Sequence, residues 1–296
     1  MQFGVILPTF GSLARGTDVA TAVAGVARAA DRLGYDVVWA AEHVVFPSQV
    51  TSPYPYGDRL PFAVTDPVLD AVGTLAWLAG MTTHVRLGSA VLVLPYHQPV
   101  PLAKALATVD VLSGGRLVVG VASGWLREEF ALLGVPFAER GARTDEWLAV
   151  LRALWTEERV TFAGRWIRLT EAAFFPKPVQ RPHPPVWIGG GSPAALRRVG
   201  RFGDGWLAVP RPTLEALAAD VAAIRRAAER AGRDPARIGV ASSGAAPTLA
   251  ALVDRLPDLA RIGVTSVTVP VTGWARSAAH GLELMEEFAQ RAGLGG

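Results

Sequence analysis

The chain has 296 residues, of which 50% are hydrophobic, 19% are charged and none is cysteine. With a mean hydropathy of +0.28, this composition excludes a disordered chain, and the missing cysteines exclude a disulfide framework and a thiolate metal site. No apolar run approaches the roughly 18 residues that a membrane span needs, and the first residues lack the basic region of a secretory signal. We therefore expect a cytoplasmic protein with no membrane partner.

The charge of the chain is modest and evenly spread. The formal net charge is only +3, and the sequence pI of about 9.7 reflects arginines such as Arg197 and Arg198 that are scattered along predicted helices. This scatter is typical of solvated helix faces, so we expect no nucleic-acid partner. A mild positive bias does suit a small anionic ligand.

Hydrophobic periodicity predicts an alternation of strands and helices along the whole chain. An apolar stripe from Val19 to Leu33 indicates the first helix, and Gly34 is typical of a helix C-terminus. The predicted strands lie near residues 3–8, 36–41, 86–92, 117–122, 186–190, 205–209, 238–242 and 266–271. The predicted helices lie near residues 18–33, 67–82, 98–112, 140–156, 193–200, 213–231, 247–261 and 277–292.

The fold class follows from the composition and number of these strands. Residues 117–122 are almost wholly apolar, which is typical of a parallel sheet buried on both faces. Eight strand–helix units in 296 residues fit a TIM barrel with insertion loops better than an open doubly wound sheet. No linker or change in composition marks a second domain. We expect an α/β TIM barrel formed by one domain over residues 1–296.

Two segments interrupt the alternation. Residues 46–67 are rich in proline and tyrosine and follow the second strand at the active-site face, so we interpret them as a cover over the substrate site. At the end of this segment, Asp66 precedes Pro67 and is interpreted as the N-cap of the next helix. Residues 159–185 contain two short β-prone runs around residues 163–165, which predicts a small hairpin beside the barrel.

The chemistry of a TIM barrel lies where its strands end. The second strand ends in Glu42 and His43, a carboxylate beside the one side chain that titrates near neutral pH. Four interpretations are open: a general acid–base pair, an electrostatic partner for a cofactor ring, half of a metal site, and a satisfied structural histidine. No third ligand stands at a metal-binding spacing, so we expect no metal.

The third and fourth strands also end in a distinctive composition. Small side chains lie inside the third strand, at Gly88, Ser89 and Ala90. They indicate a bulge or the close approach of something flat. At the end of the fourth strand, Gly124 opens space and Trp125 offers a planar apolar wall. For Glu128 and Glu129, which follow, a site role and a solvated first helical turn are both open.

The most informative stretch follows the fifth strand. Three glycines, Gly189, Gly190 and Gly191, are followed by Ser192, which suits a helix N-cap, and Pro193, which suits a first helical residue. Glycines let a ligand approach the backbone, and the free amides of a helix start attract a phosphate. The alternative is a tight turn without a ligand, but three glycines exceed what a turn needs.

Six stretches carry a family resemblance: residues 87–91, 104–120, 124–130, 175–180, 182–190 and 203–206. Together they resemble the luciferase-like monooxygenase superfamily over nearly the whole chain. The resemblance implies a TIM barrel that binds FMN or the deazaflavin coenzyme F420 at its C-terminal face, and a homodimer. It implies a non-proline cis peptide between Ala90 and Val91, and a histidine at His43 that faces the cofactor ring. It also implies a phosphate site at the glycines.

The motifs and the resemblance define the candidate site. Its cofactor-binding residues are Ser89, Ala90, Val91, Ser123, Gly124, Glu128, Gly189, Gly190, Gly191 and Ser192. The catalytic candidates are His43 first and Glu42 second. The substrate candidates are aromatic and indicate an apolar or aromatic small molecule: Phe46, Tyr54, Tyr56 and Trp125.

Two departures from the family pattern bear on the cofactor. Ser123 stands where luciferase-type FMN enzymes often place an arginine near the cofactor phosphate. Trp125 stands where the F420-dependent glucose-6-phosphate enzyme has a glutamate that is proposed as its general acid. The second departure argues against glucose 6-phosphate as the substrate. Ser123 in place of the arginine, together with the Gly124-Trp125 sequence, favours an F420-dependent oxidoreductase that transfers a hydride. The alternatives are an FMN-dependent monooxygenase supplied with reduced flavin, and a catalytically silent flavin-binding protein. A flavin or F420 reductase is a candidate partner.

Overall fold

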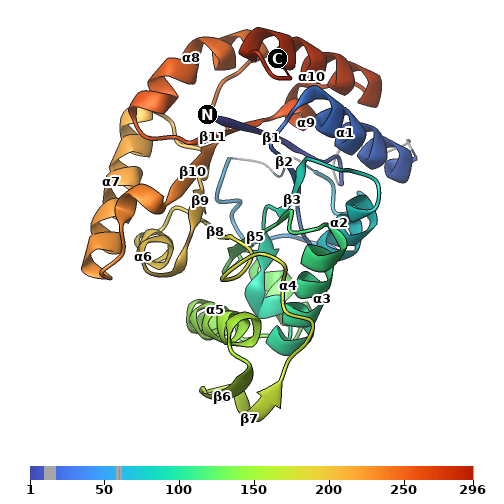
Figure 1. Ribbon diagram of the computed structural model, residues 1–296. Helices are drawn as coiled ribbons and strands as arrows, with labels where there is room; N and C mark the ends of the chain where they lie inside the picture. Colours follow the sequence, from blue (N-terminus) through green and yellow to red (C-terminus); the bar gives the residue numbers. More distant parts are fainter. Residues whose placement is uncertain (10–17, 58–59, 61, 296) are drawn as a thin grey trace.

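The structure is a computed structural model that describes residues 1–9, 18–57, 60 and 62–295, and parallel strands form its centre (Figure 1). The strands are β1 (Gln2–Ile6), β2 (Val37–Ala40), β3 (Arg86–Ser89), β4 (Leu92–Val93), β5 (Leu117–Ala122), β8 (Val186–Gly189), β9 (Gly205–Leu207), β10 (Gly239–Ser242) and β11 (Ser266–Val269). Their hydrogen-bonded order is β3-β2-β1-β11-β10-β9-β8-β5-β4, and a further pairing of β3 with β5 closes the ring. Because β3 and β4 are two pieces of one predicted strand, these nine strands fill eight positions. The predicted TIM barrel is confirmed.

Helices surround the barrel (Figure 1). They are α1 (Val19–Leu33), α2 (Ala71–Ala79), α3 (Pro99–Leu112), α4 (Arg127–Leu132), α5 (Arg140–Thr156), α6 (Pro193–Phe202), α7 (Leu214–Arg230), α8 (Leu249–Arg261), α9 (Val271–Trp274) and α10 (Ala278–Ala292), with short 3₁₀ turns η1 (Leu94–Tyr96), η2 (Phe137–Glu139) and η3 (Pro235–Arg237). Gly34 ends α1 in the left-handed conformation with a φ of 81°. Ser192 caps α6 by accepting a hydrogen bond from the amide of Ala195. The sequence predicted both the C-terminus of α1 at Gly34 and the N-terminus of α6 at Ser192.

The start of α2 corrects one prediction. The helix begins at Ala71, four residues after Pro67, and its N-cap is Asp70, which accepts a hydrogen bond from the amide of Gly73. Asp66 is buried in the preceding loop and accepts from the amide of Ala63 instead. The N-cap assignment of Asp66 was therefore wrong. The short helices α4 and α9 were also outside the predicted set.

Tryptophans fill the barrel interior and explain some of its glycines. Trp39 and Trp187 are 2% and 8% exposed, and their ring centroids lie 6.1 Å apart. A Cβ at Gly88 would lie 2.3 Å from the Trp39 ring, so Gly88 makes room for this indole and not for a ligand. A Cβ at Gly120 would lie 1.8 Å from the carbonyl oxygen of Ser89, so only glycine fits there.

The predicted hairpin lies beside the barrel, next to α5 (Figure 1). Strands β6 (Arg159–Ala163) and β7 (Arg168–Ala173) pair antiparallel. The carboxylate of Glu146 on α5 accepts hydrogen bonds from three consecutive turn amides, those of Arg165, Trp166 and Ile167. One helix side chain therefore fixes the turn against the barrel.

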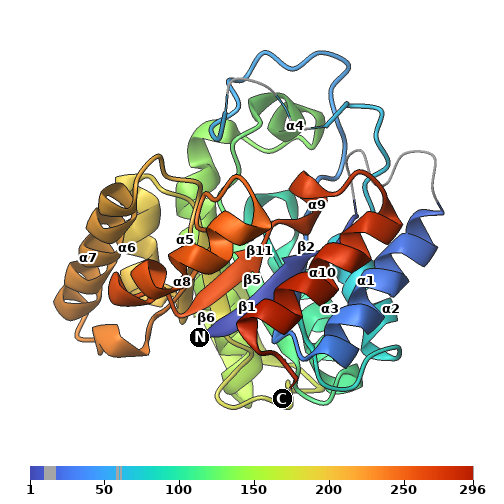
Figure 2. The ribbon, with the colours of Figure 1, turned by 90° about the horizontal axis from the view of Figure 1, so that it is seen from above.

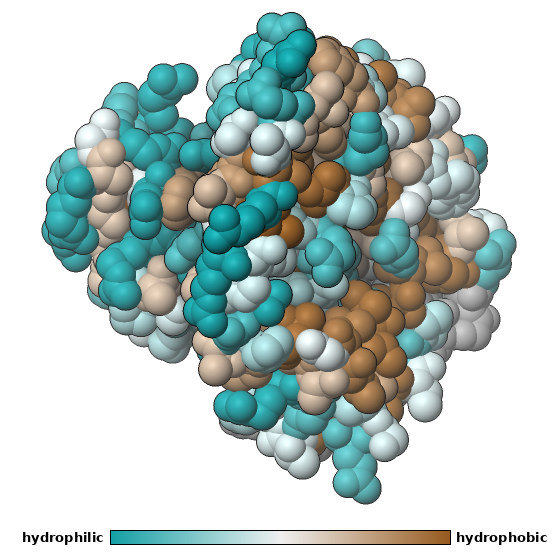
Figure 3. All heavy atoms as spheres, turned by 90° about the horizontal axis from the view of Figure 1, so that it is seen from below, coloured by the Kyte–Doolittle hydropathy of each residue, from teal (hydrophilic) through white to brown (hydrophobic). Residues whose placement is uncertain are grey.

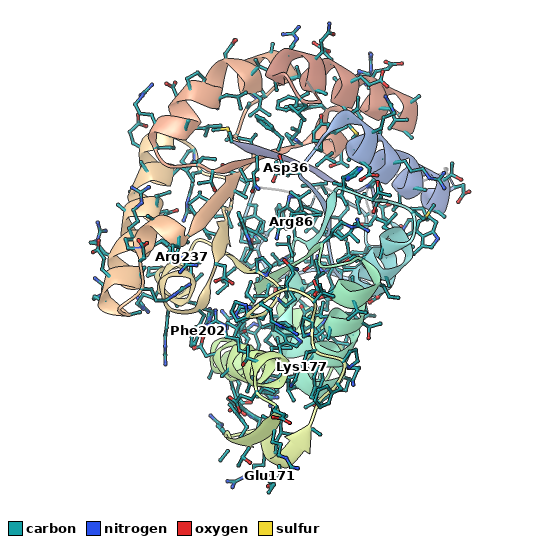
Figure 4. All side chains as sticks on the ribbon, in the orientation of Figure 1. Asp36, Arg86, Glu171, Lys177, Phe202 and Arg237 are labelled. Atoms are coloured by element: carbon teal, nitrogen blue, oxygen red, sulfur yellow. The ribbon has the colours of Figure 1, made fainter. Side chains whose placement is uncertain are left out.

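The two ends of the barrel differ. At the amino ends of β2 and β3, Asp36 and Arg86 lie near each other at the centre of the barrel (Figure 4). At the opposite end, residues 46–57 arch over the barrel close to α4 (Figure 2). The long segment after the second strand is therefore at the carboxyl ends of the strands, where the sequence placed it.

The surface is mixed in character. Hydrophobic residues on the face drawn in Figure 3 form patches that polar and charged residues separate. Large apolar side chains that remain exposed include Leu112, Leu132, Phe175 and Val179. Within the described part of the chain, no helix is both long and apolar enough to cross a bilayer. The homodimer and the cytoplasmic location remain predictions.

Candidate active site

A cavity of about 640 Å³ lies at the carboxyl ends of the strands, beneath residues 54–56. Ligand cavities of TIM barrels occur at this end, and this volume is typical of a cofactor or small-molecule site. Most of the predicted site residues line it: Glu42, His43, Tyr54, Tyr56, Ala90, Val91, Ser123, Gly124, Trp125, Gly189, Gly190, Gly191 and Ser192. Three predicted residues do not line it: Phe46, Ser89 and Glu128.

His43 lies in the cavity wall, and a buried carboxylate holds its ring. Its Nδ1 atom is 2.7 Å from Oε2 of Glu129, a residue that is completely buried. The hydroxyl of Tyr96 donates to the same oxygen at 3.1 Å. The solvated-turn interpretation of Glu129 was therefore wrong, because α4 directs this carboxylate inward toward His43.

Glu42 does not form a pair with His43. Its two oxygens accept from the amide of Val93 at 2.7 Å and contact Nε2 of His97 at 2.9 Å, and Glu42 is only 6% exposed. Burial opposes protonation of His97, but the hydrogen bond to the Glu42 carboxylate outweighs it and raises the pKa of His97. Glu42 thus holds β4 and His97 in place at the edge of the cavity.

The interrupted third strand forms part of the cavity wall. The peptide bond between Ala90 and Val91 is cis, as the family resemblance implied, and both residues line the cavity. Ser89 lies behind them, completely buried, and its hydroxyl exchanges hydrogen bonds with the backbone of Gly120. The assignment of Ser89 to the cofactor is therefore corrected: its polar atom joins β3 to β5.

The glycine loop forms a cradle at another side of the cavity. Gly190 has a φ of 109°, and a Cβ at Gly191 would lie 2.3 Å from the guanidinium of Arg211. The loop leads into the N-terminus of α6, where backbone amides favour an anion. Gly191 therefore makes room for the guanidinium of Arg211, which also lines the cavity, and the positive φ of Gly190 favours a residue without a side chain.

Arginines that the sequence analysis did not select also line the cavity. Arg198 of α6 is 9% exposed, and it donates to Asp145 at 2.6 Å and to the hydroxyl of Ser123 at 3.1 Å. Arg140 begins α5, and within the described ranges it has no carboxylate partner. Burial and the positive charges of Arg127 and Arg198 lower the pKa of Arg140. This end of the cavity is therefore positive.

Aromatic rings also line the cavity and surround His43. The ring of Tyr54 lies 5.5 Å from Trp125, and that of Phe62 lies 5.6 Å from His43. The ring of Phe46 lies 4.6 Å from that of His43, tilted by 38°, and Phe46 does not line the cavity. These rings form an apolar surface next to the histidine.

Glu128 anchors the covering segment and has no contact with the cavity. Its oxygens accept from the amides of Thr51 and Ser52, both at 2.8 Å, and from both of their hydroxyls. Burial opposes the charge, but these hydrogen bonds outweigh it and lower the pKa of Glu128 to about 2. The assignment of Glu128 to the cofactor is corrected because both oxygens face the covering segment.

We expect acid, or the substitution Glu128→Gln, to release residues 46–57. Because the pKa of Glu128 is lower in the folded protein, the stabilisation is complete above its ordinary value of 4.5 and is lost as the pH falls toward about 2. Hydrogen exchange, corrected for intrinsic rates, should show the amides of Thr51 and Ser52 exchanging about 2- to 10-fold faster in Glu128→Gln at neutral pH. Glu283→Gln, on the exposed face of α10, is the control. Unchanged protection in Glu128→Gln would contradict the anchor.

The fold and the site together define a TIM barrel whose cavity is lined by a glycine loop at a helix N-terminus, a histidine and aromatic rings. The chain belongs to the luciferase-like monooxygenase family, whose model matches residues 1–281. In the described residues no cluster of three or more histidine, cysteine or acidic side chains is arranged to hold a metal.

Relatives within this similarity use two cofactors. The chain is 36% identical over 166 residues to an FMNH(2)-dependent dimethylsulfone monooxygenase from Pseudomonas putida, covering 55% of this chain and 45% of that protein. It is 33% identical over 186 residues to an F420-dependent glucose-6-phosphate dehydrogenase from Amycolatopsis mediterranei, and this match covers 60% of this chain and 50% of that protein. The crystal structure of monooxygenase RslO1 from Streptomyces bottropensis superposes with a TM-score of 0.79 at 25% identity over 98% of both chains.

Proposed function

We propose that this protein is an F420-dependent oxidoreductase that transfers a hydride between the deazaflavin and a small apolar or aromatic substrate. One observation carries the proposal: the cavity places a positive glycine cradle and a carboxylate-held histidine around one space. The family supports a flavin-type cofactor, and Ser123 in place of the arginine of FMN enzymes, together with the Gly124-Trp125 sequence, favours F420 over FMN.

The residues of the cavity fit such a cofactor. A phosphate suits Gly190, Gly191 and the amides at the start of α6, because the positive end of the helix favours an anion and the guanidinium of Arg211 lies beside Gly191. Arg140 and Arg198 add positive charge at this end. Ala90 and Val91 would lie against the ring system.

Bound F420 supplies the carbon that donates or accepts a hydride. The chain itself handles the proton: Nε2 of His43, the ring nitrogen not bonded to Glu129, would take a proton from a substrate hydroxyl during oxidation and return it during reduction. Tyr54, Tyr56 and Trp125 would position an apolar or aromatic substrate and exclude water. Glu42 takes no part in proton transfer, because Val93 and His97 occupy its oxygens.

The second candidate function is an FMN-dependent monooxygenase supplied with reduced flavin by a separate reductase. The similarity to the Pseudomonas putida monooxygenase favours it. The two candidates differ in cofactor preference and in the need for oxygen. The F420 proposal predicts that F420 binds more tightly than FMN, and that turnover continues when oxygen is removed. Equilibrium titration with both cofactors, followed by turnover with and without oxygen, tests it.

A further inference from the structure

The carboxylate of Glu129 is completely buried and receives four donors, two on each oxygen. Oε1 accepts from the backbone amides of Val44 at 2.7 Å and Val45 at 3.1 Å. Oε2 faces Nδ1 of His43 at 2.7 Å and the hydroxyl of Tyr96 at 3.1 Å. An ionised carboxylate has about four acceptor positions and no donor, so this group is fully satisfied only if all four partners donate.

The protonation of the partners follows from this arrangement. Burial opposes ionisation of Glu129, but the hydrogen bonds from His43, Val44 and Val45 outweigh it and lower the pKa of its carboxyl group. Burial and the nearby Glu129 charge raise the pKa of Tyr96, so its hydroxyl keeps its proton and donates. Nδ1 of His43 must also carry a proton, because Oε2 of the ionised Glu129 carboxylate has no proton to donate in this hydrogen bond.

We propose that Glu129 is a positioning residue that holds neutral His43 in the tautomer with a proton on Nδ1 and a bare Nε2 available to the cavity. The surrounding rings of Phe46, Phe62 and Trp125 restrict the rotation of the imidazole but offer its nitrogens no stronger partner. The catalytic meaning of the tautomer rests on the proposed function. The tautomer itself does not, since it follows from contacts within the chain.

Glu129→Gln should invert this tautomer. The amides of Val44 and Val45 are fixed donors, so the single carbonyl oxygen of a glutamine must face them. Its amide nitrogen, which only donates, then faces His43 and Tyr96. The Tyr96 hydroxyl can rotate and accept, but His43 can accept at Nδ1 only by moving its proton to Nε2. An amide in place of this carboxylate therefore presents the cavity with a protonated Nε2.

The test is nitrogen NMR of the full-length protein with labelled histidine, recorded at a pH where the imidazoles are neutral. The chain has only five histidines, and loss of one set of signals in His43→Asn assigns His43. We expect a protonated Nδ1 and a bare Nε2 in the wild-type protein, and the reverse in Glu129→Gln. Glu283→Gln is the matched control, because it makes the same substitution at an exposed position of α10, away from the cavity, and should leave the His43 signals unchanged.

Two outcomes would overturn the proposal. A protonated Nε2 in the wild-type protein contradicts it without any variant, so the test stands even if Glu129→Gln does not fold. An unchanged tautomer in folded Glu129→Gln contradicts it as well. Once a substrate is known, inverted signals with full turnover would uphold the positioning role of Glu129 and reject proton transfer by His43. Inverted signals with turnover reduced to the level of His43→Asn would support both.

Discussion

Replacing His43 with asparagine is expected to lower kcat by about 10²- to 10⁴-fold, the usual contribution of a positioned proton donor or acceptor. Asparagine cannot exchange a proton near neutral pH, although its amide can still donate to Glu129. Because the glycine loop and the arginines, and not His43, are proposed to hold the anionic part of F420, its binding should change far less than kcat. Steady-state kinetics and an equilibrium titration of the same variant measure the two effects separately.

His84→Asn is the control for this experiment. His84 is exposed, and it contributes its backbone amide to Asp31. Its replacement should leave both kcat and cofactor binding unchanged. Full turnover in His43→Asn would contradict the assigned proton transfer. Loss of cofactor binding to the same extent as turnover would show that His43 belongs to the cofactor site instead.

Replacing Arg140 with methionine is expected to weaken F420 binding by about 10- to 150-fold, which corresponds to ~1.5–3 kcal/mol for a hydrogen bond to a charged group. The structure gives this cation three unfavourable surroundings: partial burial, the nearby charges of Arg127 and Arg198, and the first position of α5, where the helix dipole opposes it. A bound anion would relieve all three.

The stability of the unliganded protein separates this effect from damage to the fold. Arg140→Met removes an unfavourably placed charge, but it also removes the contact of the guanidinium with the Phe137 ring at 3.8 Å and its hydrogen bond to the Phe137 carbonyl, so the thermal midpoint should change little. Arg197→Met removes an exposed arginine of α6 and is the control for net charge. Equal binding of F420 by wild type and Arg140→Met would contradict the anion site at this end of the cavity. A large fall in the thermal midpoint of Arg140→Met would indicate that Arg140 stabilises the fold, and would contradict its assignment to the anion site.

The fold was largely predictable because its signals are local. Buried parallel strands are continuous apolar runs, and each helix carries a stripe of period 3.6, so both appear in short windows of sequence. The glycine cradle was predictable for the same reason, since Gly189 to Pro193 joins a strand end to a helix cap within a few residues. The start of α2 was not, because a proline after Asp66 competed with the true cap at Asp70.

The partners of the site residues were not predictable, because they come from distant parts of the chain. Glu42 and His43 are adjacent in sequence, but they have different partners. Glu42 contacts His97, which lies 55 residues away, and His43 contacts Glu129, which lies 86 residues away. Neighbouring residues in extended chain point in opposite directions, so adjacency was a poor guide to pairing. The signal for Glu129 was an acidic residue one position before the apolar Phe130, on the buried face of a short helix.

The most direct test of the account is a parallel equilibrium titration of the purified protein with F420 and with FMN, followed by fluorescence. We predict micromolar or tighter binding of F420 and much weaker binding of FMN. Preference for FMN would contradict the hydride-transfer function and favour the monooxygenase. Binding of neither cofactor would contradict the phosphate cradle at Gly189 to Ser192, on which the account depends.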